Sequence, residues 1–221
     1  MREEICDAAH VLADRGLVGP FGHVSARMDE SQILITPAVP LATVTPAELL
    51  MVALDADVLA SRVPKEAWIH MAIYQARPDV GAVARAIPES TFSAGAAFDE
   101  LRPLHGQASW LGPVVHVHPV PRLLRDRSAA EAAAQTLGRS DAMILRGNGA
   151  VTVAATPGLA VARMHLLDTA CRVRLAVDGP VQELGADDIA AWRDAQDPLL
   201  ERLWRNLADE SHIPHRRKEN A

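Results

Sequence analysis

The sequence has few of the features that mark a nucleic-acid-binding protein. No cluster of lysine and arginine occurs before residue 214, and 22 basic residues against 28 acidic ones give a formal net charge of −6. Nucleic acid and anionic membrane surfaces are therefore not expected as partners. One short basic run, at residues 215–218, stands at the end of the chain, and we interpret it as part of a solvated tail.

Long apolar runs and paired cysteines are missing as well. No stretch of 18 uninterrupted apolar residues occurs, so no membrane span is expected. The first four residues carry acid and no apolar core, so we expect no signal peptide. The two cysteines, Cys6 and Cys171, fall in apolar helical patterns. We interpret them as small buried side chains rather than a disulfide, and we expect a cytoplasmic protein.

What the sequence does contain is enough apolar material for one large core. Of its 221 residues, 49% are hydrophobic, and neither a repeat nor a low-complexity linker interrupts them. We therefore expect a single domain over residues 1–207, followed by a C-terminal tail over residues 208–221.

Apolar periodicity, glycine and proline predict a mixture of short strands and helices. The helices are expected over residues 3–14, 65–77, 91–97, 129–137, 157–177 and 187–207, with a short one opened by a capping box at 45–48. The strands are expected over residues 23–27, 33–36, 52–54, 82–87, 114–118, 142–145 and 150–154, with another short strand after the turn at 56–57. Short strands between helices predict an α/β fold in which a central sheet has helices on both faces.

Four segments, in order, resemble the class II aldolase/adducin superfamily over roughly residues 3–207. They are GHVSAR at 22–27, ILITP at 33–37, EAWIHMAIYQARPDV at 66–80 and LRGNGA at 145–150. With His23, the first of them resembles the decarboxylase-like branch more than the sugar-phosphate aldolases. The resemblance implies a three-layer α/β/α subunit with a mainly antiparallel sheet, assembled as a homotetramer with active sites between subunits. It also implies a catalytic glutamate and a zinc-type ion held by a His-x-His strand and a third histidine.

The three positions that match those metal ligands have lost their histidines. The His-x-His strand is replaced by Arg85-Ala86-Ile87, and the third histidine by Asn148. Arginine and isoleucine offer no lone pair to a cation, so the inherited site is not expected to hold metal. The phosphate-binding serine and glycine positions of the family are also changed, to Ala38-Val39 and Pro64-Lys65. A sugar phosphate is therefore not the expected substrate.

The residue that matches the catalytic glutamate is kept as Glu66, with His70 four positions later on one helix face. Arg85, where a metal ligand stood, could hold a carboxylate or stabilise an enolate in place of the cation. An internal salt bridge between Arg85 and Glu66 is the other interpretation. We name Glu66 and Arg85 as catalytic candidates, and the candidates for substrate binding are His23, Ser25, His70, Asn148, His116 and His118. Tyr74 is interpreted as a packing residue.

The segment His116-x-His118-Pro119 looks like the missing metal motif on another strand. Alternation places both rings on one face of a strand, which suits metal ligation. No third ligand is evident, and two histidines that line the pocket or a subunit interface are the alternative. Zinc or another divalent metal is expected only if this pair forms a relocated site.

Three hypotheses about function follow. The first is a metal-independent carbon–carbon lyase, a decarboxylase or retro-aldolase acting through Glu66 and Arg85 on a small non-phosphorylated carboxylated or hydroxylated metabolite. The second is a non-catalytic, adducin-like binding protein. The third is a metal enzyme that uses His116 and His118.

Overall fold

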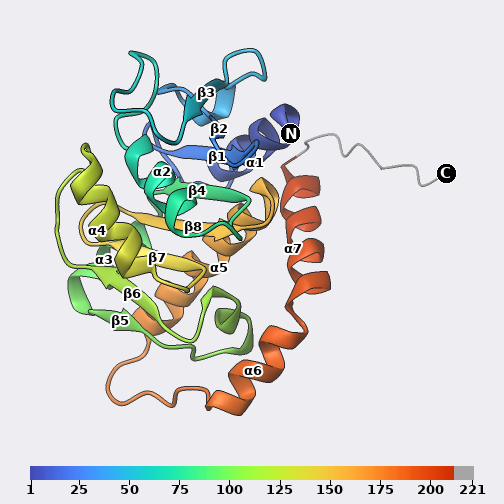
Figure 1. Ribbon diagram of the computed structural model, residues 1–221. Coiled ribbons are helices and arrows are strands. Elements are labelled where there is room, and N and C mark those ends of the chain that lie inside the picture. The colour runs from blue at the N-terminus through green and yellow to red at the C-terminus, as the bar shows by residue number, and fades with distance from the viewer. Residues whose placement is uncertain (212–221) are drawn as a thin grey trace.

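A single eight-stranded sheet runs through the computed structural model, which describes residues 1–211 (Figure 1). The expected tail began at residue 208, but residues 208–210 form the end of the last helix, and residues 212–221, with the basic run 215–218, lie outside the described residues. The strands are β1 (His23–Arg27), β2 (Gln32–Ile35), β3 (Leu50–Ala53), β4 (Ala82–Ala86), β5 (Glu100–Leu101), β6 (Val115–His118), β7 (Ala142–Leu145) and β8 (Ala150–Ala154). Their order is β3-β2-β1-β4-β8-β7-β6-β5. Each neighbouring pair is antiparallel except β6 and β7. The expected mainly antiparallel sheet is confirmed.

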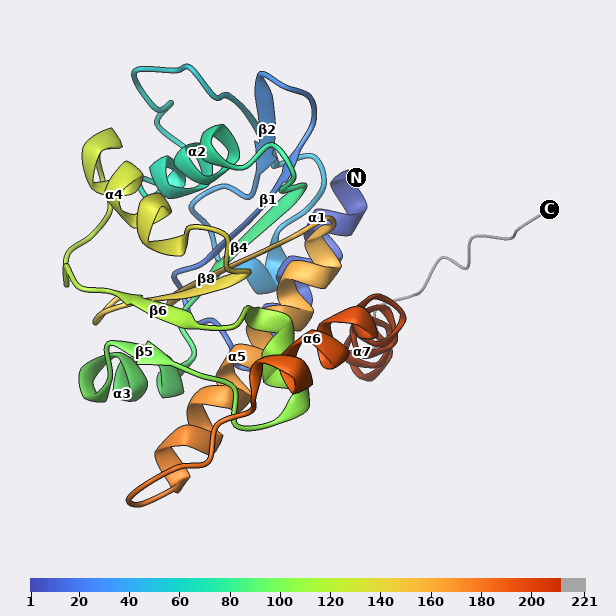
Figure 2. The ribbon, with the colours of Figure 1, turned by 60° about the horizontal axis from the view of Figure 1, so that its bottom comes forward.

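Helices cover both faces of this sheet. They are α1 (Arg2–Asp14), α2 (Ala67–Ala76), α3 (Glu89–Ala97), α4 (Arg127–Leu137), α5 (Pro157–Ala176), α6 (Ala186–Asp194) and α7 (Gln196–Glu210), with short 3-10 helices η1 (Leu41–Thr43) and η2 (Gly106–Leu111). Figure 2 shows α2 and α4 on one face and α1, α3 and α5 on the other, with α6 and α7 at the side of α5. The α/β/α layering is therefore also confirmed.

Side-chain alternation divides the core into two layers and decides which face the site occupies. On β4, Val83 packs in the cluster under α2 and α4, whereas Ala82 and Ala84 pack in the cluster under α1 and α5. Because side chains two residues apart share a face of a strand, Arg85 lies on the same side as Val83. The charged residue therefore projects toward α2, away from the alanine-lined face on which α5 lies.

Three local predictions were wrong. The capping box at 45–48 forms only in part: the Thr45 amide and hydroxyl both donate to the Glu48 carboxylate, but the Glu48 amide donates to the Thr45 backbone carbonyl and not to its hydroxyl. Only a turn follows, because β3 begins at Leu50. Residues 54–66, all within the described part of the chain, form turns and irregular backbone instead of a further strand. The last helix is divided at Ala195, because Pro198 in the first turn of α7 cannot continue the preceding helix. It also ends later than expected, at Glu210.

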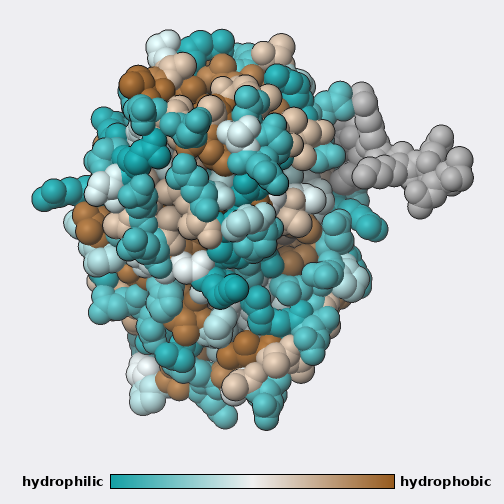
Figure 3. Space-filling model, in the orientation of Figure 1, coloured by the Kyte–Doolittle hydropathy of each residue, from teal (hydrophilic) through white to brown (hydrophobic). Residues whose placement is uncertain are grey.

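The surface of the molecule is mixed in character. The face in Figure 3 is mostly hydrophilic, with small hydrophobic patches scattered over it. Within the described residues, the helices include none that combines the length and the apolar character needed to cross a membrane.

Candidate functional site

The candidate residues gather where β1 and β4 lie side by side under α2. In the antiparallel register of these strands His23 is opposite Arg85, and Ser25 is opposite Val83. The four side chains therefore share the face of the sheet that α2 covers. Glu66 is the residue immediately before α2, and His70 lies in its first turns. The expected helix start at residue 65 is thus two residues early, and Glu66 belongs to the helix entry rather than to a helix face.

A buried ion pair forms the centre of this cluster. Nη2 of Arg85 lies 3.0 Å from Oε2 of Glu66, and the two side chains are 2% and 11% exposed. The same nitrogen donates to the Asn148 side-chain oxygen at 2.6 Å and to the Asn148 carbonyl at 3.0 Å. Glu66 Oε1 accepts from the Asn148 side-chain amide at 2.7 Å and from the Leu124 backbone amide at 3.1 Å. Carboxylate, guanidinium and amide therefore form one closed network.

The turn between β7 and β8 carries Asn148 to the end of β4. Gly147 and Gly149 flank Asn148 and adopt φ angles of +66° and +83°, which favour glycine. A Cβ on Gly149 would stand 2.3 Å from the carbonyl oxygen of Ala86. Glycine thus allows the turn to touch the strand, and this close approach brings Asn148 against Arg85.

The electrostatics of the network follow from burial. Removal from water lowers the pKa of Arg85, and the carboxylate of Glu66 opposes that change. A weaker contact, at 3.5 Å, joins Arg85 Nη1 to the carbonyl of Phe21. The guanidinium therefore has oxygen acceptors from three separate segments, and it occupies the place where these segments meet.

A second chain of hydrogen bonds runs beside the ion pair. The Ser25 hydroxyl lies 2.7 Å from Nδ1 of His70 and 2.9 Å from the Tyr74 hydroxyl, and all three residues are buried. The ring of His23 is near, with its centroid 5.7 Å from that of His70. Tyr74, interpreted from the sequence as packing only, therefore also contributes a hydroxyl to the site.

Both histidines are neutral at physiological pH in this environment. Burial, with a further contribution from the charge on Arg85, lowers the pKa of His70 to about 3. Burial together with His70 and Arg85 holds the pKa of His23 well below its ordinary value. The rings can therefore donate or accept hydrogen bonds, while the positive charge in the cluster is that of Arg85.

The structure brings most of the sequence candidates together and leaves two apart. Glu66, Arg85 and Asn148 are in direct contact, and His23, Ser25 and His70 adjoin them. In contrast, His118 on β6 pairs its Nδ1 with the Thr136 hydroxyl of α4 at 2.9 Å, and His116 is exposed. The backbone amide of Leu124, which binds Glu66, gave no signal in the sequence because any residue could supply it.

The positions that match the family's metal ligands converge, but their chemistry does not suit a metal. Arg85 and Asn148 touch, and Ile87 follows β4 directly. The guanidinium has no lone pair, isoleucine has no donor atom, and the Asn148 oxygen already accepts from Arg85. Among residues 1–211, no group of three or more histidine, cysteine, aspartate or glutamate side chains is placed to hold a metal ion.

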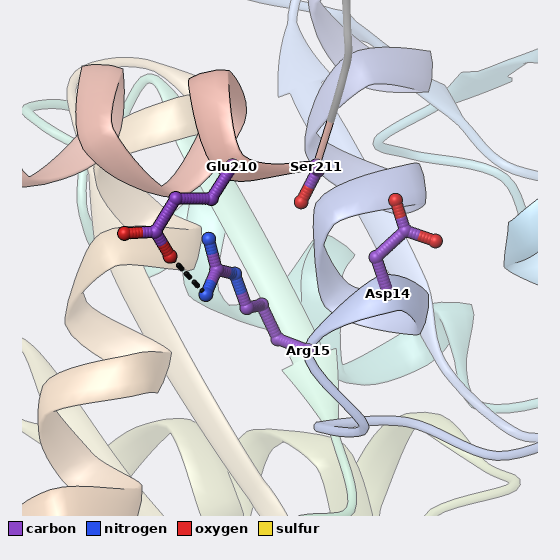
Figure 4. Close-up of a pocket in the computed structure, with 4 residues that line it drawn as sticks. All are labelled: Asp14, Arg15, Glu210 and Ser211. Carbon is purple, nitrogen blue, oxygen red and sulfur yellow. Dashed lines mark ion pairs between the residues drawn. The ribbon is translucent and has the colours of Figure 1, made fainter.

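A surface hollow of about 320 Å³ lies elsewhere, between the end of α1 and the end of α7 (Figure 4). Asp14, Arg15, Glu210 and Ser211 line it, and Arg15 forms an ion pair of 2.6 Å with Glu210. Since α1 packs on the face of the sheet opposite to α2, this hollow is separate from the Glu66–Arg85 network.

Comparison with known proteins finds a family match over most of the chain. The model of the family described as the Class II Aldolase and Adducin N-terminal domain matches residues 3–175. The chain is 30% identical over 212 residues to a 3,4-dihydroxyphthalate decarboxylase from Terrabacter sp. (strain DBF63), covering 87% of this chain and 89% of that protein. It is 29% identical over 213 residues to the decarboxylase of the same name from Rhodococcus jostii (strain RHA1), covering 89% and 88%.

A solved structure shows the same fold. YgbL from Escherichia coli superposes with a TM-score of 0.76 at 24% identity, over 87% of this chain and 97% of that one. The matched family region contains every residue of the Glu66–Arg85 network and of the neighbouring histidine cluster.

Proposed function

This chain belongs to the class II aldolase and adducin family, and we propose that it is a lyase that releases CO2 from a small hydroxylated aromatic carboxylate. Two relatives of about 30% identity that carry the name 3,4-dihydroxyphthalate decarboxylase support the reaction and the substrate class. The observation that carries the proposal is the buried pair of Glu66 and Arg85, which places a proton carrier beside a fixed positive charge.

We propose that the reaction needs no metal. The residues at the three inherited ligand positions do not fit a divalent ion, whereas the Arg85 guanidinium supplies a positive charge where they converge. A guanidinium binds a carboxylate through paired hydrogen bonds. Arg85 would therefore hold the carboxylate or the adjacent oxygen of the substrate. No cofactor enters the proposed reaction.

Entry of a carboxylate substrate would change the protonation of the pair. Two carboxylates beside one guanidinium repel each other, which favours uptake of one proton. Glu66 would carry this proton to the ring carbon that bears the leaving carboxylate, while an electron pair from the neighbouring phenolate oxygen makes that oxygen a ketone. The carbon–carboxylate bond then breaks, its electron pair returns the oxygen to the phenolate form, and CO2 leaves. Glu66 regains its proton from solvent.

The same ion pair also favours a second candidate function. Arg85 is almost fully buried and its Nη2 is already bound to Glu66 and Asn148. An ion pair bound within one chain is what a non-catalytic member of the family would need to stabilise an inherited site that no longer binds its ligand. An adducin-like binding protein is therefore the alternative to a lyase.

The homotetramer implied by the family remains a proposal, as does a cytoplasmic location. Two exposed apolar side chains beside the network support an interface there. Phe21, whose carbonyl contacts Arg85, is 67% exposed, and Leu123, adjacent to the amide that binds Glu66, is 49% exposed. A neighbouring subunit on this rim would place the site between subunits.

Release of CO2 from 3,4-dihydroxyphthalate by the purified protein tests the proposal. We expect turnover by the wild type and a loss of at least about 100-fold in kcat for Glu66→Gln and for Arg85→Ala, in the range of general acid and electrostatic effects. Glu100→Gln and Arg102→Ala, which remove an exposed ion pair of 2.9 Å, are the matched controls. Wild-type rates in the Glu66→Gln and Arg85→Ala variants would refute the assigned roles, and a folded wild type without turnover would favour the binding protein.

A further inference from the structure

Three nitrogen atoms beside the ion pair are buried without a hydrogen-bond partner in the described part of the chain. They are Nδ1 of His23, Nε2 of His70 and Nε of Arg85. The three side chains are neighbours, since His23 is opposite Arg85 in the sheet and its ring adjoins that of His70. An unsatisfied buried polar atom is costly, and native proteins normally pair it. Three of them in one place indicate that a polar ligand completes the site.

The hydrogen-bond chain through Tyr74 determines what kind of ligand this is. The Tyr74 hydroxyl lies 2.9 Å from the Ser25 hydroxyl, which lies 2.7 Å from Nδ1 of His70. If protons run from Tyr74 to Ser25 to His70, both hydroxyl hydrogens are used and His70 Nδ1 is an acceptor. If they run the other way, the buried Tyr74 hydroxyl hydrogen has no acceptor among residues 1–211. The first direction is therefore the stable one.

This direction decides the tautomer of His70. With Nδ1 accepting from Ser25, the proton of the neutral ring lies on Nε2, one of the three unpartnered atoms. Nε of Arg85 also carries a hydrogen. The cluster therefore presents two buried N–H donors, one of them on an uncharged ring. Such donors match an oxygen acceptor.

We propose that His70 Nε2–H and Arg85 Nε–H bind the hydroxyl-derived oxygen next to the leaving carboxylate, and that Ser25 and Tyr74 are positioning residues that hold His70 in the donating tautomer. This inference rests on the proposed function and names the substrate group that the site recognises. The electron pair of the breaking carbon–carbon bond moves onto that oxygen. Donors fixed before the reaction stabilise the charge that it gains.

Binding of a product-type ligand tests the subsite without turnover. We compare 3,4-dihydroxybenzoate with benzoate, which lacks the hydroxyl oxygens, by titration calorimetry on the full chain. Loss of one hydrogen bond to a partly charged oxygen changes affinity by about tenfold. Ser25→Ala should therefore weaken the affinity for 3,4-dihydroxybenzoate by about 3–10-fold and leave the affinity for benzoate within twofold of the wild type. Ser25→Thr should restore the preference for 3,4-dihydroxybenzoate over benzoate.

Thr152→Val is the matched control. It removes another fully buried hydroxyl, bonded to the Ala160 carbonyl at 2.7 Å, from the opposite face of the same sheet. We expect it to change neither affinity. Nitrogen-15 NMR of histidine-labelled protein gives an independent readout: wild-type His70 should carry its proton on Nε2, and Ser25→Ala should show a mixture of tautomers.

The outcomes separate this inference from the function on which it rests. If neither ligand binds the wild type, both the proposed function and the subsite are refuted. If both bind but Ser25→Ala weakens them equally, the subsite alone is refuted, since that result indicates a structural role. A His70 proton found on Nδ1 in the wild type also overturns the proposal.

Discussion

Removing one member of the Glu66–Arg85 pair should destabilise the protein far more than removing both. Arg85→Met would leave the Glu66 carboxylate buried with only the Asn148 and Leu124 amides to bind it. A buried charge deprived of its partner costs about 3–5 kcal/mol, whereas replacement of a whole buried pair by neutral groups is often close to neutral. We therefore expect each of Arg85→Met and Glu66→Gln to cost several kcal/mol, and the double variant to recover about 2 kcal/mol or more of their sum.

Urea unfolding followed by far-UV circular dichroism measures these free energies. All variants are compared at pH 7 and one protein concentration, because an oligomer would make stability concentration-dependent. The exposed pair of Arg102 and Glu100 provides the control cycle, with an expected coupling below about 1 kcal/mol. Additive effects of Arg85→Met and Glu66→Gln would refute the conclusion that the two groups form one buried network.

Three further predictions concern acid stability, packing and metal. The pKa of His70 is about 3 in the folded protein and 6.5 in the unfolded chain, so the contribution of His70 to the free energy of unfolding is complete above pH 6.5 and falls by about 2 kcal/mol between pH 7 and 5. Urea unfolding of His70→Asn should therefore show a flatter dependence of stability on pH than the wild type. An unchanged pH dependence in this variant would contradict a buried neutral ring. Gly158→Ala should cost about 1–3 kcal/mol, since its Cβ would stand 2.3 Å from the Trp204 ring; a wild-type unfolding midpoint and tryptophan fluorescence would show this contact to be unimportant. If His116 and His118 formed a relocated metal site, elemental analysis of protein purified without added metal would find a stoichiometric divalent ion, and His118→Ala would remove it. We expect no stoichiometric metal in the wild type and no change in metal content in His118→Ala.

The positions of the site residues could be predicted from the sequence, but their contacts could not. Motif order places Glu66, Arg85 and Asn148 at converging points of the family fold, and the structure brings them together. The ion pair was one of two interpretations of Arg85, because spacing alone does not say whether a guanidinium faces an internal carboxylate or an open pocket. The amide of Leu124 comes from a loop 58 residues beyond Glu66, and a backbone donor leaves no trace in residue type.

The wrong prediction of a helix after the capping box has a physical cause. The Glu48 carboxylate accepts from the Thr45 amide and hydroxyl, as in one half of a capping box, but the next residues pair with β2, as Leu50 opposite Ile35 shows. Sheet pairing therefore prevailed over a local helix signal. Tyr74 was underestimated for a similar reason, because a buried tyrosine in an apolar helix gives no indication of the Ser25 hydroxyl on a neighbouring strand.

The most direct test of metal-independent lyase chemistry is CO2 release from 3,4-dihydroxyphthalate by wild-type protein that has been stripped with a chelator and checked for metal content. We predict that the stripped protein keeps its rate within about twofold and that Glu66→Gln, treated identically, loses at least about 100-fold. Loss of activity on chelation, with recovery on adding zinc or another divalent ion, would contradict the assignment of the metal's role to Arg85.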